Sequence, residues 1–441
     1  WVDGEDGTFA VTNPARGDVI AEVASLSRAQ VSKAIDNAYA AQKEWAKLTG
    51  KERAAILRKW FDLMTQNAED LGIILTAEQG KPKAEATGEI HYGASFVEFF
   101  AEEAKRVYGE TIPGHQRDKR ITVIKQPIGV AASITPWNFP NAMITRKVAP
   151  GLAAGCTMVI KPSDFTPYSA LALCVLAERA GIPRGVLNVL TGRPEEIGAT
   201  LTASPVVRKL SFTGSTRVGA LLAEQCAPTL KKMSLELGGN APFIVFDDAD
   251  LDAAVEGAMA SKFRNGGQTC VCANRILVQS GIHDRFVAAL SARVDALKVG
   301  PGTEDGTMIG PMINAAAITK IAAHVEDALA KGAARATETR DLPEQFADPV
   351  VLTGATPEMQ LAREETFGPV APIFKFETEE DALDLANGTP FGLAAYFYTT
   401  DMARAFRFGE ALEAGLVGLN TGMVSHAEAP FGGVKASGLG R

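Results

Sequence analysis

The sequence is poor in several features, and each shortage excludes a class of protein. Only five of its 441 residues are cysteine, too few for the disulfide framework of a small secreted domain. Its 44 Lys and Arg against 52 Asp and Glu give a net charge of −8, whereas nucleic-acid binding requires a surplus of cations. No apolar run approaches the roughly 20 residues that span a bilayer, and no signal peptide opens the chain. We therefore expect a cytoplasmic protein without nucleic-acid or membrane partners.

Two further absences concern cofactor and metal sites. The sequence contains neither G-x-G-x-x-G nor G-x-x-x-x-G-K-[ST], so the usual nucleotide fingerprints are missing. Its five histidines are scattered, and the C-x-C of Cys270 and Cys272 alone supplies too few ligands for tetrahedral zinc. We expect no metal site, and no local signature marks a Cys–His hydrolase.

What is present is an alternation of strand and helix patterns. Helical spacing is expected over residues 27–47 and 51–79, and the β-rich stretch 121–135, broken by Pro127, predicts a hairpin or edge ribbon. Strands and helices then alternate in two sets, the first from residue 157 and the second from residue 242. Strands of the second set are expected at 242–246, 275–279, 309–313 and 370–376. This order predicts an α/β fold of doubly wound parallel sheets, with ligands at the carboxyl ends of strands.

Cys270 is the first candidate for chemistry. A lone cysteine is most often a small buried hydrophobe, and Cys156, Cys174 and Cys226 lie in apolar strand or helix patterns. Cys270 instead follows the polar, flexible sequence Asn-Gly-Gly-Gln-Thr, which would let its sulfur meet a substrate. Whether it is a nucleophile or a packed residue stays open at this point.

Two other features support a ligand site. Glu236 alternates with Leu235 and Leu237 and precedes a double glycine at a predicted strand end, where ligands of α/β sheets bind; the alternative is a solvated strand glutamate. In "FTGST", a strand leads through Gly214 into a helix capped by Ser215 or Thr216. Free N–H groups at that helix start could receive a phosphate, although such turns are common.

Seven motifs together resemble one enzyme family. In chain order they are "TPWNFP", "KPSDFTP", "SFTGST", "LELGGNAP", "FRNGGQTCVCANR", "EETFGP" and "APFGGVKASGLGR". Their order and spacing resemble the aldehyde dehydrogenase superfamily over essentially the whole chain, and most of all its succinate-semialdehyde dehydrogenases. That family binds a nicotinamide cofactor in a variant Rossmann fold without the glycine fingerprint.

The resemblance implies roles for individual residues. Cys270 matches the nucleophile and Glu236 matches the general base. Asn138 matches the side chain that binds the oxyanion together with the Cys270 backbone N–H. A glutamate at position 236 favours hydrolytic over CoA-acylating chemistry. The positions implied to contact the cofactor are Trp137, Asn138, Lys161, Asp164, Gly214, Ser215, Leu237, Glu365 and Phe367. Asp164 near the adenosine ribose favours NAD, with NADP as the alternative.

The implied substrate is an aldehyde that carries a distal carboxylate. The positions that bind the carboxylate of succinate semialdehyde are matched by Arg146, Arg264 and Ser425. A guanidinium group can bind a carboxylate through two parallel hydrogen bonds. The alternative is that both arginines have only a structural role. His426 and Ala427 depart from close relatives, so glutarate semialdehyde or another oxo acid is an alternative. The remaining alternatives are a broad aldehyde dehydrogenase and a catalytically silent structural or binding member. Cys272 is either a packed neighbour or the partner of Cys270 in an oxidative switch.

The resemblance also implies a division of the chain. It assigns residues 1–112 and 135–238 to a cofactor-binding domain, 239–428 to a catalytic domain, and 429–441 to a segment that returns to the cofactor domain. Residues 113–134 would form a small β ribbon for a homodimer or homotetramer, whose companion C-terminal strand is missing from the chain.

Overall fold

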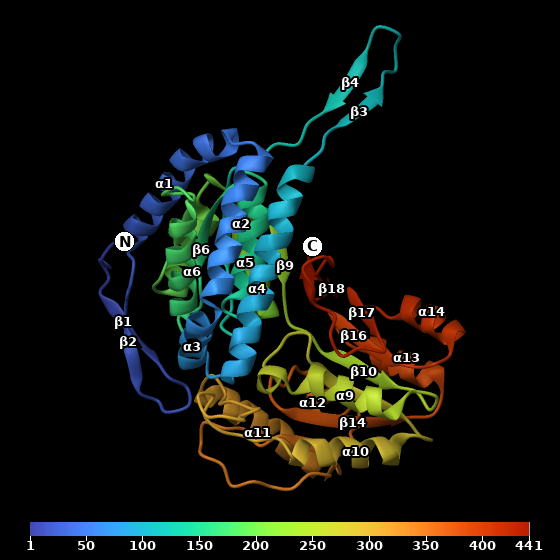
Figure 1. The fold of residues 1–441 in the computed structure, drawn as a ribbon. Coiled ribbons are helices and arrows are strands. Elements are labelled where there is room, and N and C mark those ends of the chain that lie inside the picture. The colour runs from blue at the N-terminus through green and yellow to red at the C-terminus, as the bar shows by residue number, and fades with distance from the viewer. Residues whose placement is uncertain (441) are drawn as a thin grey trace.

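The computed structural model describes residues 1–440 and shows two lobes, each built on one large sheet (Figure 1). The first sheet has six strands in the order β19-β9-β8-β5-β6-β7, and the second has seven in the order β12-β13-β14-β11-β10-β16-β17. Within each sheet neighbouring strands are parallel, apart from an antiparallel strand at one edge, β19 or β12. The α/β class with parallel sheets is therefore confirmed.

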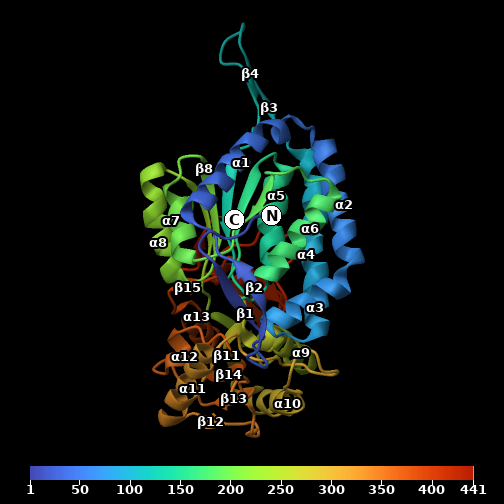
Figure 2. The same cartoon turned by 90° about the vertical axis from the view of Figure 1, so that its left-hand side faces the viewer.

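Helices cover both faces of the first sheet, as Figure 2 shows. One face packs on α1, α7 and α8, and the other on α2 to α6. The strands are β5 (Val130–Ile134), β6 (Thr157–Lys161), β7 (Leu187–Val189), β8 (Val207–Thr213), β9 (Lys232–Glu236) and β19 (Gly438–Leu439). The helices are α1 (Arg28–Lys47), α2 (Gly50–Gln66), α3 (Ala68–Gln79), α4 (Lys83–Glu103), α5 (Ala142–Ala153), α6 (Pro167–Ala180), α7 (Pro194–Ala203) and α8 (Thr216–Cys226).

Local chemistry explains several of these boundaries. Helix α1 begins after Ser27, whose side chain accepts from the Gln30 N–H in a reciprocal capping box. The single helical region expected over 51–79 is divided at Asn67, which ends α2 and begins α3. Helix α3 ends at Gly80, whose φ of 93° suits glycine.

Two strand predictions are wrong. Only Arg120–Val123 (β4) of the stretch predicted as a ribbon pairs with β3 (Glu110–Pro113) in a hairpin. The later residues form β5, a buried central strand between β8 and β6, because Gly129, with φ of 115°, redirects the chain after Pro127. Residues 309–313 form no strand beyond one bridge from Ile309 to Val299. The implied domain division stays a prediction, and its last residue, Arg441, lies outside the described residues.

The second sheet is likewise covered on both faces, by α9 and α10 on one and by α11, α13 and α14 on the other. Its strands are β10 (Ala241–Val245), β11 (Ala273–Gln279), β12 (Ala334–Arg335), β13 (Val350–Thr353), β14 (Val370–Phe376), β16 (Ala394–Tyr398) and β17 (Leu416–Leu419). Its helices are α9 (Leu251–Lys262), α10 (His283–Asp295), α11 (Ala315–Ala330), α12 (Gln360–Arg363), α13 (Glu379–Asn387) and α14 (Met402–Ala411).

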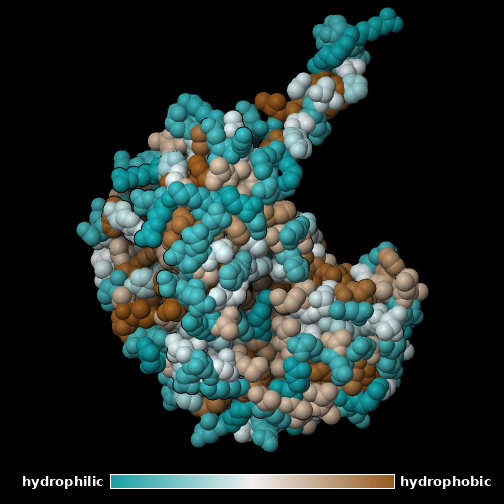
Figure 3. Space-filling view, viewed as in Figure 1, coloured by the Kyte–Doolittle hydropathy of each residue, from teal (hydrophilic) through white to brown (hydrophobic). Residues whose placement is uncertain are grey.

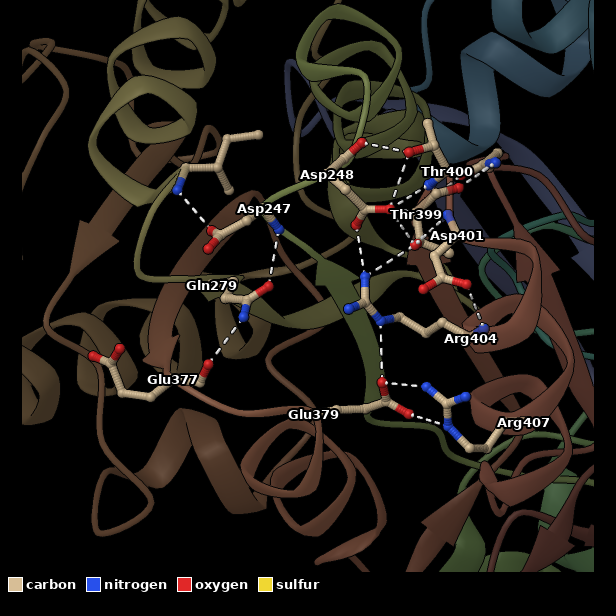
Figure 4. Close-up of polar contacts among 12 residues, drawn as sticks. Asp247, Asp248, Gln279, Glu377, Glu379, Thr399, Thr400, Asp401, Arg404 and Arg407 are labelled. Carbon is tan, nitrogen blue, oxygen red and sulfur yellow. Dashed lines mark hydrogen bonds and ion pairs between the residues drawn. The ribbon is translucent and has the colours of Figure 1, made fainter.

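Asp248 anchors α14 to this sheet (Figure 4). One carboxylate oxygen accepts from the Thr399 hydroxyl at 2.7 Å and from the Thr400 N–H at 2.8 Å. The other accepts from Arg404 at 2.7 Å, and Arg404 also pairs with Glu379 at 3.1 Å. Burial alone would raise the pKa of Asp248, but the hydrogen bonds from Thr399, Thr400 and the Asp401 N–H lower it. The network therefore joins β10, β16, α13 and α14.

Smaller pieces complete the fold. Strands β1 (Thr8–Thr12) and β2 (Val19–Ala24) pair along the first lobe, and β15 (Phe391–Gly392) pairs with β18 (Val434–Lys435). Short 3₁₀ helices lie at η1 (Ala104–Arg106), η2 (Ala227–Thr229) and η3 (Arg264–Gly267). The β3–β4 hairpin projects away from both lobes (Figure 1). Among residues 1–440 no helix combines the length and apolar character required to cross a membrane.

Candidate active site

The predicted site residues meet where the first lobe faces the second. Glu236 is the last residue of β9, and Asn138 follows the carboxyl end of β5. Cys270 lies in the turn between η3 and β11 of the second lobe. The segment between β9 and β10 passes from one lobe to the other, and it can approach the Cys270 turn because Gly239 has no side chain: a Cβ there would lie 2.4 Å from the Cys270 carbonyl oxygen.

Cys270 is half-buried and faces charged groups of both signs. Burial, followed by the nearby Glu365 carboxylate, raises the pKa of Cys270 to about 12. The guanidinium groups of Arg146 and Arg264 oppose this rise, and Glu236 adds to it. The resting thiol is therefore neutral at pH 7, and a base must take its proton before it can attack.

Asn138 is buried and fixed at both its side chain and its backbone. Its side-chain amide nitrogen donates to the Gln268 carbonyl at 3.0 Å, two residues before Cys270. Its own backbone carbonyl accepts from Lys81 and from the Asn265 side chain, each at 2.9 Å. Because the amide nitrogen carries two N–H bonds, one can donate to a ligand while the other is held by Gln268.

Glu236 is buried rather than solvated, at 7% exposure. Its backbone carbonyl accepts from Gly214 at 3.0 Å, which ties it to the end of β8. The carboxylate acts on Lys147 of α5: burial lowers the pKa of Lys147 to about 7, and Glu236 opposes that fall. Lys147 donates to the Ser211 hydroxyl at 3.0 Å. Sequence reasoning missed this lysine, since nothing local distinguishes it from any helical lysine.

Residues expected around an adenosine and its phosphates surround the ends of β6 and β8. Lys161 is buried, donates to the Pro162 carbonyl at 2.7 Å and pairs with Asp164. Burial lowers the pKa of Lys161, while Asp164 raises it. Ser215 caps α8, accepting from Val218 at 3.4 Å. Gly214 lies against the Phe212 ring, where a Cβ would clash at 2.4 Å.

Glu365 and Phe367, expected around a nicotinamide, lie between α12 and β14 of the second lobe, and Phe367 contacts Trp137, which was expected nearer the adenosine ribose and phosphates. Trp137 and Phe367 pack edge to face, with ring centroids 5.6 Å apart. Phe367 has a φ of 57°, uncommon for a residue with a side chain. Glu365 accepts from Gly239 at 3.4 Å, and burial raises the pKa of Glu365 to about 7. Leu237 is buried against Gly219 of α8.

Arg146 and Ser425 are in direct contact. Arg146 donates to Ser425 at 3.0 Å and to the Tyr92 hydroxyl at 2.6 Å. Its guanidinium also lies over the Phe431 and Phe96 rings, at 4.3 and 4.8 Å. Tyr92, hydrogen-bonded to Ser425 as well, was missed because it lies on α4, far away in the sequence.

Arg264 makes a different set of contacts. Its guanidinium contacts the Met423 sulfur at 3.5 Å and lies over the Phe139 ring at 5.1 Å. The guanidinium groups of both Arg146 and Arg264 lie close enough to the Cys270 thiol to oppose the rise of its pKa, so two cations are placed near the sulfur.

Cys272 points away from the site. Its thiol donates to the Lys262 carbonyl at 3.2 Å, it is 4% exposed, and burial raises its pKa. All five cysteines are free thiols. In the described part of the chain no group of three His, Cys, Asp or Glu side chains is placed to hold a metal ion.

Comparisons with known proteins agree across the whole chain. A sequence model of the aldehyde dehydrogenase family matches residues 1–441. The chain is 59% identical to a glutarate-semialdehyde dehydrogenase of Pseudomonas putida, covering 100% of this chain and 92% of that one. It is 58% identical to an NADP⁺ succinate-semialdehyde dehydrogenase of Escherichia coli, with the same coverage. A crystal structure of an aldehyde dehydrogenase from Brucella melitensis biovar abortus 2308 superposes with a TM-score of 0.99 at 64% identity, covering 100% and 92% of the two chains.

Proposed function

Since the chain belongs to the aldehyde dehydrogenase family, we propose that it oxidises succinate semialdehyde, or a close ω-oxo acid such as glutarate semialdehyde, to the dicarboxylate. The NAD(P)-dependent aldehyde dehydrogenase activity follows from the family and its close relatives. The substrate is the finer proposal. Its main support is the Arg146 guanidinium, a cation held by Ser425 and Tyr92 near Cys270.

Cys270 begins the reaction. Once a base has removed its proton, the thiolate adds to the aldehyde carbon and forms a C–S bond, while the carbonyl oxygen becomes an alkoxide. The second N–H of the Asn138 amide and the Cys270 backbone N–H stabilise this alkoxide as a thiohemiacetal anion. When bound, a nicotinamide cofactor accepts the hydride that leaves this carbon. The carbon is then held on Cys270 as a thioester.

Glu236 completes the cycle. Its buried carboxylate takes a proton from water, whose oxygen adds to the thioester carbon and expels the Cys270 thiolate with release of the carboxylic acid. Burial lowers the pKa of Lys147 to about 7, and this lysine is close enough to Glu236 for the carboxylate to oppose that fall. Glu236 is also the group we assign to deprotonate the thiol, and it releases that proton to solvent before it takes one from water.

The cofactor residues suit a dinucleotide. The start of α8 at Ser215 offers backbone N–H groups to a pyrophosphate, and the bare Gly214 lets it approach. The Lys161–Asp164 pair presents one cation and one carboxylate for the adenosine ribose. Asp164 would repel a 2′-phosphate, which supports NAD, with NADP as the alternative.

We propose that the protein assembles as a dimer or tetramer through the β3–β4 hairpin. An isolated two-stranded hairpin is marginally stable, and this one exposes several apolar side chains beside its polar ones (Figure 3). These are Ile112, Ile121, Val123 and Ile124. Light scattering should give a mass above the 46.6 kDa of the monomer, and a monomer at micromolar concentration would contradict the assembly.

Substrate trials test the proposed function. The protein is mixed with NAD or NADP and with succinate semialdehyde, glutarate semialdehyde or butanal, and reduced nicotinamide is followed by its absorbance. We expect kcat/KM for one of the oxo acids to exceed that for butanal by at least tenfold. Equal kcat/KM values for the oxo acids and butanal would indicate a broad aldehyde dehydrogenase. If no aldehyde led to reduction of the nicotinamide, the protein would be a catalytically silent family member.

A further inference from the structure

A buried ion pair outside the reacting groups lies directly behind Asn138. Lys81, just after α3, and Glu89 of α4 form a 2.6 Å salt bridge, with each side chain 1% exposed. The same ammonium donates to the Asn138 carbonyl at 2.9 Å and lies 3.9 Å from the centre of the Phe139 ring. The Lys81 ammonium therefore has a carboxylate, a carbonyl and an aromatic ring for its three N–H groups, and the carbonyl and the ring belong to the neighbouring residues Asn138 and Phe139.

Glu89 extends the contact to helix α5. Its second carboxylate oxygen accepts from the backbone N–H groups of Asn141 and Ala142, at 2.9 and 3.2 Å. A carboxylate at the start of a helix is stabilising. The Lys81–Glu89 pair therefore holds the segment 138–142 at both ends. Lys81 binds the carbonyl at its start, and Glu89 binds the two backbone N–H groups at its end.

Residues of the segment 79–89 also contact the turn that precedes Cys270, through Asn265. Asn265, with φ of 53°, donates to the Asn138 carbonyl at 2.9 Å and to the Gln268 carbonyl at 3.3 Å. Its backbone N–H donates to Glu85 at 2.9 Å, and its side-chain oxygen accepts from Gln79 at 3.0 Å. Residues between Gln79 and Glu89 therefore contact both the Asn138 peptide and the turn before Cys270.

We infer that Lys81 is a positioning residue, which with Asn265 holds the Asn138 carbonyl so that the Asn138 side-chain amide is aimed at the oxygen bound beside Cys270. The inference rests on the proposed function, because it assigns Lys81 to the same oxyanion site. A displacement of about 1 Å at a reacting geometry can cost about 10²-fold in rate.

A purely structural role is the competing explanation. Replacing a buried ion pair with neutral side chains of similar size is often neutral for stability. The double variant K81M/E89Q removes both charges and the bond to the Asn138 carbonyl, while the amide oxygen introduced at position 89 still accepts from the start of α5. Its melting temperature is expected to stay close to that of the wild type.

Two reactions of Cys270 that need no cofactor separate positioning from the reactivity of the sulfur. Acylation by p-nitrophenyl acetate forms a thioester with release of nitrophenolate, and passes through an oxyanion. Alkylation by iodoacetamide displaces iodide and forms no oxyanion. In K81M/E89Q we expect acylation to fall about 10- to 100-fold and alkylation to stay within about twofold of the wild type.

A double-mutant cycle with N138A tests whether Lys81 acts through the amide. N138A itself should lower acylation about 10²- to 10³-fold, and K81M/E89Q should add little to it. K83M is the matched control, because Lys83 is half-exposed and pairs with Glu69 at the surface; it should acylate like the wild type.

The outcomes distinguish this inference from the proposed function. If N138A does not slow acylation, the oxyanion role of Asn138, and with it the proposed mechanism, fails. If N138A slows it but folded K81M/E89Q does not, or if the two effects simply multiply, the positioning role of Lys81 is overturned. Should K81M/E89Q not fold, N265G removes the other donor to the Asn138 carbonyl at a residue whose φ suits glycine. Wild-type acylation by N265G would equally overturn the inference.

Discussion

Replacing Arg146 with methionine tests the substrate proposal most directly. Methionine retains apolar contact with the Phe96 and Phe431 rings, over which the guanidinium lies at 4.8 and 4.3 Å. It removes the charge and the donors to Tyr92 and Ser425. If the distal carboxylate of the substrate binds here, the variant loses one charged hydrogen-bonded contact with the oxo acid and none with an unbranched alkyl aldehyde.

The size of the effect follows from that contact. A hydrogen bond to a charged group contributes about 1.5–3 kcal/mol, which corresponds to about 10- to 160-fold in kcat/KM. Because the contact forms equally in the ground and transition states, the loss should appear mainly as a higher KM. Burial raises the cost of leaving a carboxylate unpaired, so the upper half of this range is expected.

The assay compares kcat and KM for succinate semialdehyde and butanal. We expect the loss for the oxo acid alone, with butanal within about twofold of the wild type. R58M is the matched control, since Arg58 also lies over an aromatic ring, that of Phe61, but pairs with Glu98 and Glu102 on the outside of α2 and α4. Equal losses for both aldehydes in R146M would refute the carboxylate contact.

Three further predictions concern titration and stability. Because its pKa is raised to about 12, Cys270 of the free enzyme should alkylate about tenfold faster per pH unit through pH 10; a plateau near pH 8 would refute this. Glu365, with its pKa raised to about 7, adds stability that is full below its usual 4.5 and lost as pH rises through 7. E365Q should therefore gain melting temperature relative to wild type over that window, and a loss that does not depend on pH would contradict this. D248N should lower stability by about 1–3 kcal/mol by leaving the donors of Arg404 and Thr400 poorly matched, and an unchanged melting temperature would remove the anchoring role of Asp248.

Sequence patterns sufficed where one short segment carries the signal. Ser27 marks the start of α1, and the apolar run at 157–161 marks the buried strand β6. They failed at Val130–Ile134, where Pro127 suggested a sheet edge although Gly129 lets a central strand begin immediately afterwards. Proline restricts only its own neighbourhood, so it says little about a strand that starts three residues later.

The site divides in the same way. Cys270, Glu236 and Asn138 could be proposed from motifs because each lies in a distinctive local sequence. Tyr92 and Lys81 could not, since their importance depends on contacts with Arg146 and Asn138, 54 and 57 residues away. The packing of α4 against α5 brings Tyr92 to Arg146, and Lys81 and Asn138 lie in the segments that precede these two helices.

Strand β19 has a consequence for how the chain matures during synthesis. Gly438 and Leu439 pair with Glu236 and Leu235, and the Ser437 carbonyl accepts from the Leu237 N–H at 2.9 Å. On a ribosome, the first lobe emerges long before these residues do, and it waits with the edge beside Glu236 open until residues 437–439 follow. The sheet that carries Glu236 is therefore completed only after the whole second lobe has been synthesised.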